Sequence, residues 1–247
     1  MLVPGEWAPI LFGTLLGAII GSFIATIIVR WPQGRSVLRG RSACDACGVQ
    51  LPARDMMPLV SYVARGGKAA CCGARIDPVH PFVEAGAMMV GLVSFALFGW
   101  HGAPAMLFGM LLLTLAMLDA RHFWLPDRLT GLLAVSGLVS PWPGITERLI
   151  GIAAGYGTLA LIGIGYRRLR GREGLGGGDP KLLGAIGAWT GWAVLPLIML
   201  GAGLAGLALV SIAWLRGAPI SGATRVPLGT LLAVVAWPVW LWFQFQP

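Results

Sequence analysis

Long apolar runs separated by short polar segments organise this chain. A helix needs about 20 apolar residues to cross the hydrocarbon core of a bilayer. Runs that predict such helices lie at about 10–29, 81–100, 105–119, 129–140, 149–166 and 227–243. The run from 182 to 215 suffices for two short helices, with a break near Gly191 or Gly201. The pattern therefore predicts an all-α polytopic membrane protein with about eight transmembrane helices.

One long polar segment interrupts this pattern and contains all four cysteines. It divides the chain into a first transmembrane helix (1–30), a cytoplasmic loop domain (31–79) and a second transmembrane part (80–247). The loop carries many more basic than acidic residues, and further basic clusters lie near 121–128, 167–172 and 216–225. The positive-inside rule places these loops in the cytoplasm and both termini outside.

The composition agrees with a membrane location, since 57% of the residues are hydrophobic and only 11% are charged. The net charge of +8 could suggest nucleic acid, but no basic recognition helix or basic patch with interleaved aromatic residues is present. We therefore expect membrane lipid, and no nucleic acid, among the partners.

Three acidic residues lie at predicted helix ends on the cytoplasmic side: Asp119, Asp127 and Asp179. Two close carboxylates in a low-dielectric site share a proton. The ionised member can then activate water while the protonated member polarises a peptide carbonyl. Asp179 follows three glycines, which would let a substrate backbone approach closely. Asp119 and Asp179 are therefore the candidate catalytic pair of an aspartyl peptidase.

Other interpretations of these acids remain open. A single aspartate at a helix end often caps the helix or pairs with an arginine, and Asp127 fits the capping role. A proton-coupled transporter would use the acids as a relay, but it should show deeper acids or an inverted repeat. A non-catalytic assembly factor would tolerate the loss of one aspartate.

The motifs together resemble those of bacterial prepilin peptidases, also called type IV leader peptidases. The resemblance covers almost the whole chain and is carried by these segments: Gly21-Ser-Phe23 with Arg30, Pro58–Tyr62, Cys72–Ile76 with Pro81 and Glu84, Leu118–Asp119, Leu125–Thr130, Gly176–Leu183, Gly187–Trp189 and Pro227-Leu-Gly229.

The resemblance implies a Gly-x-Gly-Asp aspartyl protease of the bacterial inner membrane, whose active site faces the cytoplasm. Such enzymes remove the basic leader of prepilins or pseudopilins, serving type IV pili or type II secretion. Many then methylate the new N-terminus with S-adenosylmethionine. By motif position Asp119 and Asp179 would be catalytic. Supporting roles would fall to Asp127, Gly176, Gly178 and Lys181.

The cysteines depart from the pattern of that family, which has two Cys-x-x-Cys pairs able to bind zinc with four sulfur ligands. Cys44 and Cys47 form one pair, but Ala69 stands where the third cysteine is expected, and Cys71 lies beside Cys72. A zinc site of Cys44, Cys47 and Cys72 with either Cys71 or His80 is one interpretation. A free-thiol remnant is the other.

Two charged residues are candidates for a part in methyl transfer. Glu84 lies early in the second predicted helix, where a buried acid is costly. It would pair with Arg30 or Arg75, or serve the methyltransferase site. Arg30 ends the first helix and belongs to the same candidate group.

Overall fold

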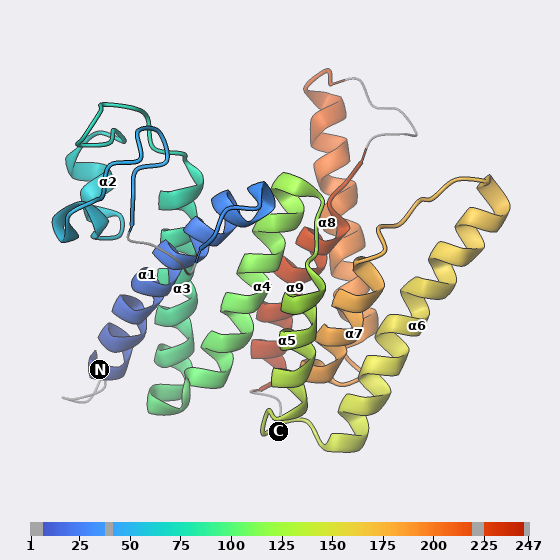
Figure 1. The fold of residues 1–247 in the computed structure, drawn as a ribbon. Helices are drawn as coiled ribbons and strands as arrows, with labels where there is room; N and C mark the ends of the chain where they lie inside the picture. Colours follow the sequence, from blue (N-terminus) through green and yellow to red (C-terminus); the bar gives the residue numbers. More distant parts are fainter. Residues whose placement is uncertain (1–6, 38–41, 219–224, 245–247) are drawn as a thin grey trace. The chain divides into compact units, whose positions relative to one another are not determined.

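A computed structural model describes residues 7–37, 42–218 and 225–244. The chain separates into two compact units, Met1–Met110 and Leu111–Pro247. Helices make up both units (Figure 1), and no β-strand occurs in the described part of the chain beyond two isolated bridges.

Unit 1 is built on two long helices, α1 (Trp7–Arg30) and α3 (Val79–Phe98), which pack along each other. Glycines at the contact bring their backbones together. A methyl group on Gly13 would lie 2.6 Å from the Gly91 carbonyl oxygen, and one on Gly91 would lie 2.0 Å from that of Gly13. Such small residues are what allow helices to approach closely where no hydrophobic driving force exists.

The polar segment between α1 and α3 folds into a small insert at the C-terminal end of α1 (Figure 1). Its described residues form short elements: η1 (Trp31–Gln33), η2 (Ala53–Met56) and α2 (Val60–Ala64). Two isolated antiparallel bridges, Ala43 with Gln50 and Lys68 with Arg75, each close a tight turn that carries cysteines. After α3, η3 (Gly99–His101) leads into α4 (Ala103–His122).

The described residues of unit 2 form the end of α4 and five further helices. These are α5 (Asp127–Leu138), α6 (Ile145–Arg170), α7 (Asp179–Thr190), α8 (Leu195–Leu215) and α9 (Leu228–Phe243). Helix α7 is at the centre and contacts α5, α6, α8 and α9. All of its residues are buried except Lys181.

Close backbone contacts and tryptophan side chains fix α7 in place. A methyl group on Gly151 of α6 would lie 2.3 Å from the carbonyl oxygen of Gly187 on α7. On the other sides, Trp189 donates its indole N–H to the Leu133 carbonyl of α5 at 2.9 Å. Trp240 of α9 donates in turn to the Trp189 carbonyl at 3.1 Å. Each buried indole thus has a hydrogen-bond partner, as burial requires.

The eight predicted helices correspond to α1 and α3–α9, and the break falls at Gly191, whose φ of 73° ends α7. Among the described residues, five helices are long and apolar enough to cross a membrane: α1, α3, α4, α6 and α8. Helices α5 and α7 have only 12 residues each, about 18 Å. Short helices are tolerated at membrane depth where neighbouring helices bury them, as they do α7.

Candidate functional site

The acidic residues singled out in the sequence lie at helix ends of unit 2. Asp119 is in the last turn of α4, while Asp127 and Asp179 are the first residues of α5 and α7. The first turn of α9, which holds Gly229 and Thr230, lies against Asp119. The ends of α4, α7 and α9 therefore meet at the two buried aspartates, Asp119 and Asp179.

Asp119 is only 5% exposed, and its oxygen Oδ2 accepts two hydrogen bonds from one residue of α9. The backbone N–H of Thr230 donates to Asp119 Oδ2 at 2.7 Å, and the Thr230 hydroxyl oxygen lies 3.1 Å from the same atom. No side chain caps α9 at its N-cap residue, Pro227. The first N–H groups of a helix need acceptors from elsewhere, and Asp119 supplies one from another helix.

Asp179 is 6% exposed and begins α7. Its Oδ2 accepts the backbone N–H of Gly176 at 3.0 Å, which closes the glycine loop onto the carboxylate. A carboxylate in the first turn of a helix also lies at the positive end of the helix dipole.

The two buried aspartates form one electrostatic unit. They are close enough that the charge of Asp119 acts on Asp179, and the backbone N–H of Gly229 lies near both carboxylates. Two buried acids at this range cannot both ionise easily. The pair that the motifs predicted is therefore brought together, although 60 residues separate its members in sequence.

Three glycines have steric reasons for their positions beside this pair. A Cβ on Gly176 would lie 3.1 Å from Asp179 Oδ2, and one on Gly229 would lie 3.0 Å from Asp119 Oδ2. A Cβ on Gly178 would lie 2.8 Å from Cβ of Leu125. Gly176 and Gly229 thus leave room for the carboxylates, whereas Gly178 leaves room for Leu125.

The remaining predicted residues of this group, Asp127 and Lys181, form an ion pair. Lys181 Nζ lies 2.6 Å from Asp127 Oδ1, and the side chains are 45% and 73% exposed. The pair joins the N-terminal turns of α5 and α7 at the surface. Its environment is therefore much more polar than that of the buried aspartates.

Thr230 is a site residue that the sequence reasoning missed. Its only signal was a hydroxyl residue directly after Pro227-Leu-Gly229, at the start of an apolar helix. The residue that accepts its hydrogen bonds lies 111 positions earlier in the chain, so no local pattern could have paired them.

A second candidate site lies in the insert of unit 1, where all four cysteine Sγ atoms lie within 4.8 Å of one another. Cys44 is 3.8 Å from Cys72, and Cys47 is 3.3 Å from Cys71. Four sulfurs around Zn²⁺ at about 2.3 Å would be about 3.8 Å apart in a tetrahedron. The cluster therefore fits a metal ion of this size and ligand preference.

Two similar turns present these thiols. In the first, Cys44 N–H donates to the Val49 carbonyl, and Gly48 N–H donates to the Cys44 carbonyl. The second turn repeats both hydrogen bonds 25 residues later. Ala69 N–H donates to the Ala74 carbonyl, and Gly73 N–H donates to the Ala69 carbonyl. By this correspondence Cys72 matches Cys47, and Ala69 matches Cys44. Cys71 supplies the fourth thiol from inside the second turn.

The thiols differ in their ease of ionisation. Backbone N–H groups of Cys47 and Ala46 point at the thiolate and lower the pKa of Cys44 to about 7. The hydrogen bond with the Cys47 thiol raises the pKa of Cys71 to about 12. Four neighbouring thiolates repel one another, and a bound cation removes this obstacle because coordination itself deprotonates thiols.

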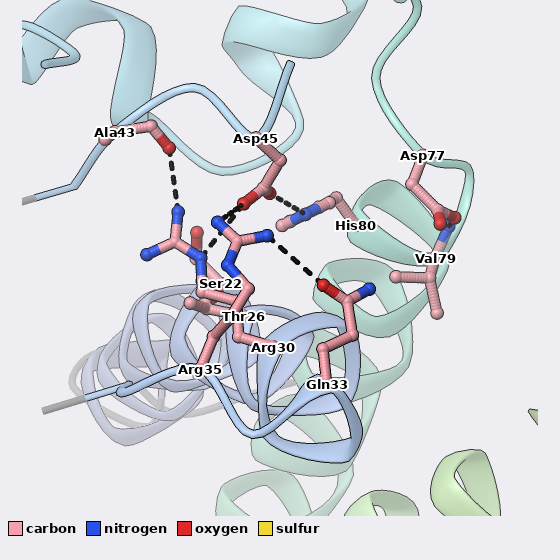
Figure 2. A network of polar contacts seen from close by, with 10 residues as sticks. All are labelled: Ser22, Thr26, Arg30, Gln33, Arg35, Ala43, Asp45, Asp77, Val79 and His80. Carbon is pink, nitrogen blue, oxygen red and sulfur yellow. Dashed lines mark hydrogen bonds and ion pairs between the residues drawn. The ribbon is translucent and has the colours of Figure 1, made fainter. Parts of the chain in front are cut away.

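Arg30 ties the first cysteine turn to α1 (Figure 2). Its Nε lies 3.0 Å from Asp45 Oδ1, and its Nη2 donates to the Ala43 carbonyl at 2.8 Å. Arg35 reaches the same oxygen of Asp45 at 3.1 Å. His80 Nε2 faces Asp45 Oδ2 at 3.9 Å, so it is Cys71, and not His80, that joins the thiol cluster.

Glu84 is 6% exposed on α3 and contacts the insert. Its Oε2 accepts the backbone N–H of Leu59 at 2.8 Å. Leu59 has a positive φ of 57°, which a branched side chain rarely adopts. Glu84 therefore fixes the strained start of α2.

Comparisons with known proteins agree with this architecture. Family models match residues 15–98, as the bacterial peptidase A24 N-terminal domain, and residues 106–211, as the type IV leader peptidase family.

Several relatives are named prepilin leader peptidase/N-methyltransferase. The one from Pseudomonas aeruginosa is 34% identical over 92% of this chain and 88% of its own length. The Dickeya chrysanthemi protein is 36% identical over 89% and 88%, and that of Klebsiella pneumoniae 36% over 80% and 91%. No solved structure matches the chain. The chain therefore belongs to the type IV leader peptidase family.

Proposed function

We propose that this chain is a membrane-embedded aspartyl endopeptidase that removes the leader peptide of type IV prepilins or pseudopilins and methylates the new N-terminus. Membership of the family and the names of its relatives supply the substrate class and both activities. The observation that carries the peptidase assignment is the burial of Asp119 and Asp179 as one interacting pair.

The pair hydrolyses the peptide bond by general acid–base catalysis. The ionised aspartate takes a proton from water as the oxygen attacks the carbonyl carbon, while the protonated aspartate donates its proton to the carbonyl oxygen. The tetrahedral intermediate collapses when its C–N bond breaks. The leaving nitrogen takes the proton that the first aspartate received, and a hydroxyl proton returns to the second. One water is consumed and both carboxyl groups regain their starting states.

The location of the site suits a substrate that is itself a membrane helix. Arg121 and Arg128 lie two and one residues after Asp119 and Asp127, Arg167 is in the last turn of α6, and Arg216 follows the last residue of α8. Basic residues therefore mark the C-terminal ends of α4, α6 and α8 and the N-terminal end of α5. By the positive-inside rule these ends face the cytoplasm. We place the enzyme in the bacterial inner membrane, with the substrate's apolar helix in the lipid and its leader at the cytoplasmic surface.

We assign the two proposed activities to different parts of the chain. Residues 80–247 would contain the peptidase, while the loop domain 31–79, following the first helix 1–30, would bind zinc and serve methyl transfer. Cys44, Cys47, Cys71 and Cys72 are the ligands that we assign to the zinc, which would hold the two cysteine turns together.

S-adenosylmethionine is the methyl donor that the N-methyltransferase name implies. Arg30 and Glu84 would affect methyl transfer indirectly, by positioning the insert. Arg30 binds Asp45 of the insert to α1, and Glu84 binds Leu59 of the insert to α3. Asp127, Gly176, Gly178 and Lys181 would support the peptidase pair through the geometry described above.

A cleavage assay tests the peptidase assignment. Purified protein in lipid is mixed with a prepilin, and the mass of the product is followed for wild type, Asp119→Asn and Asp179→Asn. We expect wild type to cleave and both variants, folded as judged by thermal unfolding, to be inactive. Cleavage by either variant at the wild-type rate would contradict the assignment. If the wild-type enzyme leaves the prepilin uncleaved, the proposed substrate is contradicted.

A further inference from the structure

Thr230 has one hydroxyl proton and two acceptors for it. The hydroxyl oxygen lies 3.1 Å from Asp119 Oδ2 and 2.9 Å from the Ala116 carbonyl oxygen, one turn earlier on α4. The backbone N–H of the same residue remains on Asp119 Oδ2 at 2.7 Å in either case. The hydroxyl can therefore change partner without any movement of the backbone.

The surroundings of the two aspartates favour different protonation states. Asp119 Oδ2 has both donors of Thr230 and the positive end of α9 beside it. Asp179 Oδ2 accepts the Gly176 N–H at 3.0 Å, and its carboxyl group lies at the positive end of α7. Each acid thus has a helix N-terminus beside it, and the two donors of Thr230 distinguish Asp119 from Asp179. Hydrogen bonds donated to a carboxylate stabilise its ionised form, and charge at a helix N-terminus is stabilised further by the helix dipole.

We propose that Thr230 is a positioning residue that keeps Asp119 the ionised member of the pair, and so makes Asp119 the base and Asp179 the acid. The hydroxyl donates to Asp119 while that group is ionised and turns to the Ala116 carbonyl once Asp119 has taken the proton of water. The assignment of acid and base rests on the proposed peptidase function, whereas the effect of Thr230 on the charge of Asp119 does not.

Few other groups near Asp119 can titrate. Helix α9 has no ionisable side chain between Leu228 and Phe243, although Arg225 precedes it. Helix α7 contributes Asp179, and also Lys181, which is paired with Asp127 of α5. Arg128 follows Asp127, and Arg121 and His122 follow Asp119 on α4. Among these, Asp179 is the acid whose titration must be separated from that of Asp119.

The experiment measures the protonation of Asp119 and the pH dependence of cleavage in the full-length protein in lipid. Infrared difference spectra between each protein and its Asp119→Asn counterpart isolate the Asp119 carboxyl band across a pH titration. The comparison uses wild type, Thr230→Val, which loses only the hydroxyl, and Thr230→Ser, which keeps it. Repeating the titration with Asp179→Asn leaves one carboxyl in the pair, so coupling no longer mixes the two.

We expect Thr230→Val to move the Asp119 titration midpoint, and the acidic limb of the kcat/KM profile, about one pH unit upward. One lost hydrogen bond to a charged group has this size. Thr230→Ser should restore both values. Thr190→Val is the control, since Thr190 is also a buried helical threonine but bonds the Ile186 carbonyl at the other end of α7.

An Asp119 midpoint that is unchanged in Thr230→Val would overturn the proposal, whatever happens to the rate. A midpoint shift that Thr230→Ser fails to reverse would also overturn it, because the effect would then come from packing. If wild type cleaves no prepilin, the proposed substrate is contradicted, and the spectra still decide whether Thr230 controls the charge of Asp119.

Discussion

The Sγ atoms of Cys47 and Cys71 lie 3.3 Å apart, so Cys71 completes a four-thiol cluster at a place where the repeat of the two turns offers only Ala69. In the first turn the corresponding position is Cys44. The protein thus forms the cluster from an altered pattern by taking the fourth thiol from the loop of the turn.

This arrangement predicts that a cysteine at position 69 can replace Cys71. Cys71→Ser should weaken zinc binding more than tenfold, and Cys71→Ser with Ala69→Cys should recover it, because the second turn would then present its thiols as the first does. Zinc per chain is measured in the purified protein after dialysis against a chelator. Ala69→Cys alone is the control and should retain zinc. Undiminished zinc in Cys71→Ser would show that three thiols suffice.

Gly229→Ala should damage catalysis without unfolding the protein. The added Cβ would lie 3.0 Å from Asp119 Oδ2 and 2.9 Å from Leu125 Cδ1, so the carboxylate has to shift. A contact of this length requires the carboxylate to move by a few tenths of an ångström. Misplacement of a catalytic group by about 1 Å can cost about 100-fold, so we expect kcat to fall roughly 3- to 10-fold. Gly157→Ala is the matched control, since its Cβ meets nothing within 4 Å. Equal kcat in the two variants would contradict the tight fit at Asp119.

The ion pair of Lys181 and Asp127 should matter much less than the buried aspartates. Exposed pairs contribute about 1 kcal/mol or less, so Lys181→Met and Asp127→Asn should each reduce cleavage less than tenfold. A double-mutant cycle on kcat/KM measures their coupling, which we expect to be below about 1 kcal/mol. A variant as inactive as Asp179→Asn would assign one of these residues a direct part in catalysis.

Gly151→Ala should destabilise unit 2. The added methyl group would lie 2.3 Å from the Gly187 carbonyl oxygen, and since both atoms belong to backbones, α6 and α7 must separate. Overpacking of this kind costs about 1–3 kcal/mol, which is measured as a lower midpoint of thermal unfolding in detergent. Gly165→Ala on the same helix meets nothing within 4 Å and should unfold as wild type does.

Arg30→Gln should separate the two proposed activities. The Arg30 side chain is 14% exposed and holds the first cysteine turn through Asp45 and Ala43, whereas the peptidase pair belongs to unit 2. We therefore expect cleavage to persist while the product lacks most of its added methyl mass. Arg35→Gln is the control, since Arg35 binds the same carboxylate from a side chain that is 46% exposed. Full methylation by Arg30→Gln would remove this residue from the methyltransferase group.

The helices and the candidate catalytic residues could be predicted from the amino-acid sequence. Apolar runs of membrane-spanning length predict helices because a bilayer imposes a fixed thickness. The sequence also predicted a break in the run 182–215 at Gly191 or Gly201, and the structure places it at Gly191, whose φ is positive. Asp119 and Asp179 could be named in advance because charged groups are costly at membrane depth and are therefore rare. All of this information is local in the chain.

The contacts that complete the two sites depend on the tertiary structure. Thr230 reaches Asp119 across 111 positions, and Cys71 reaches Cys47 across 24. Helix α7 has only 12 residues and is accommodated because neighbouring helices bury it, and its own sequence does not indicate which helices those are. Such contacts depend on which helix ends meet in space, and hydrophobic periodicity reports which face of a helix is apolar but not which partner covers it.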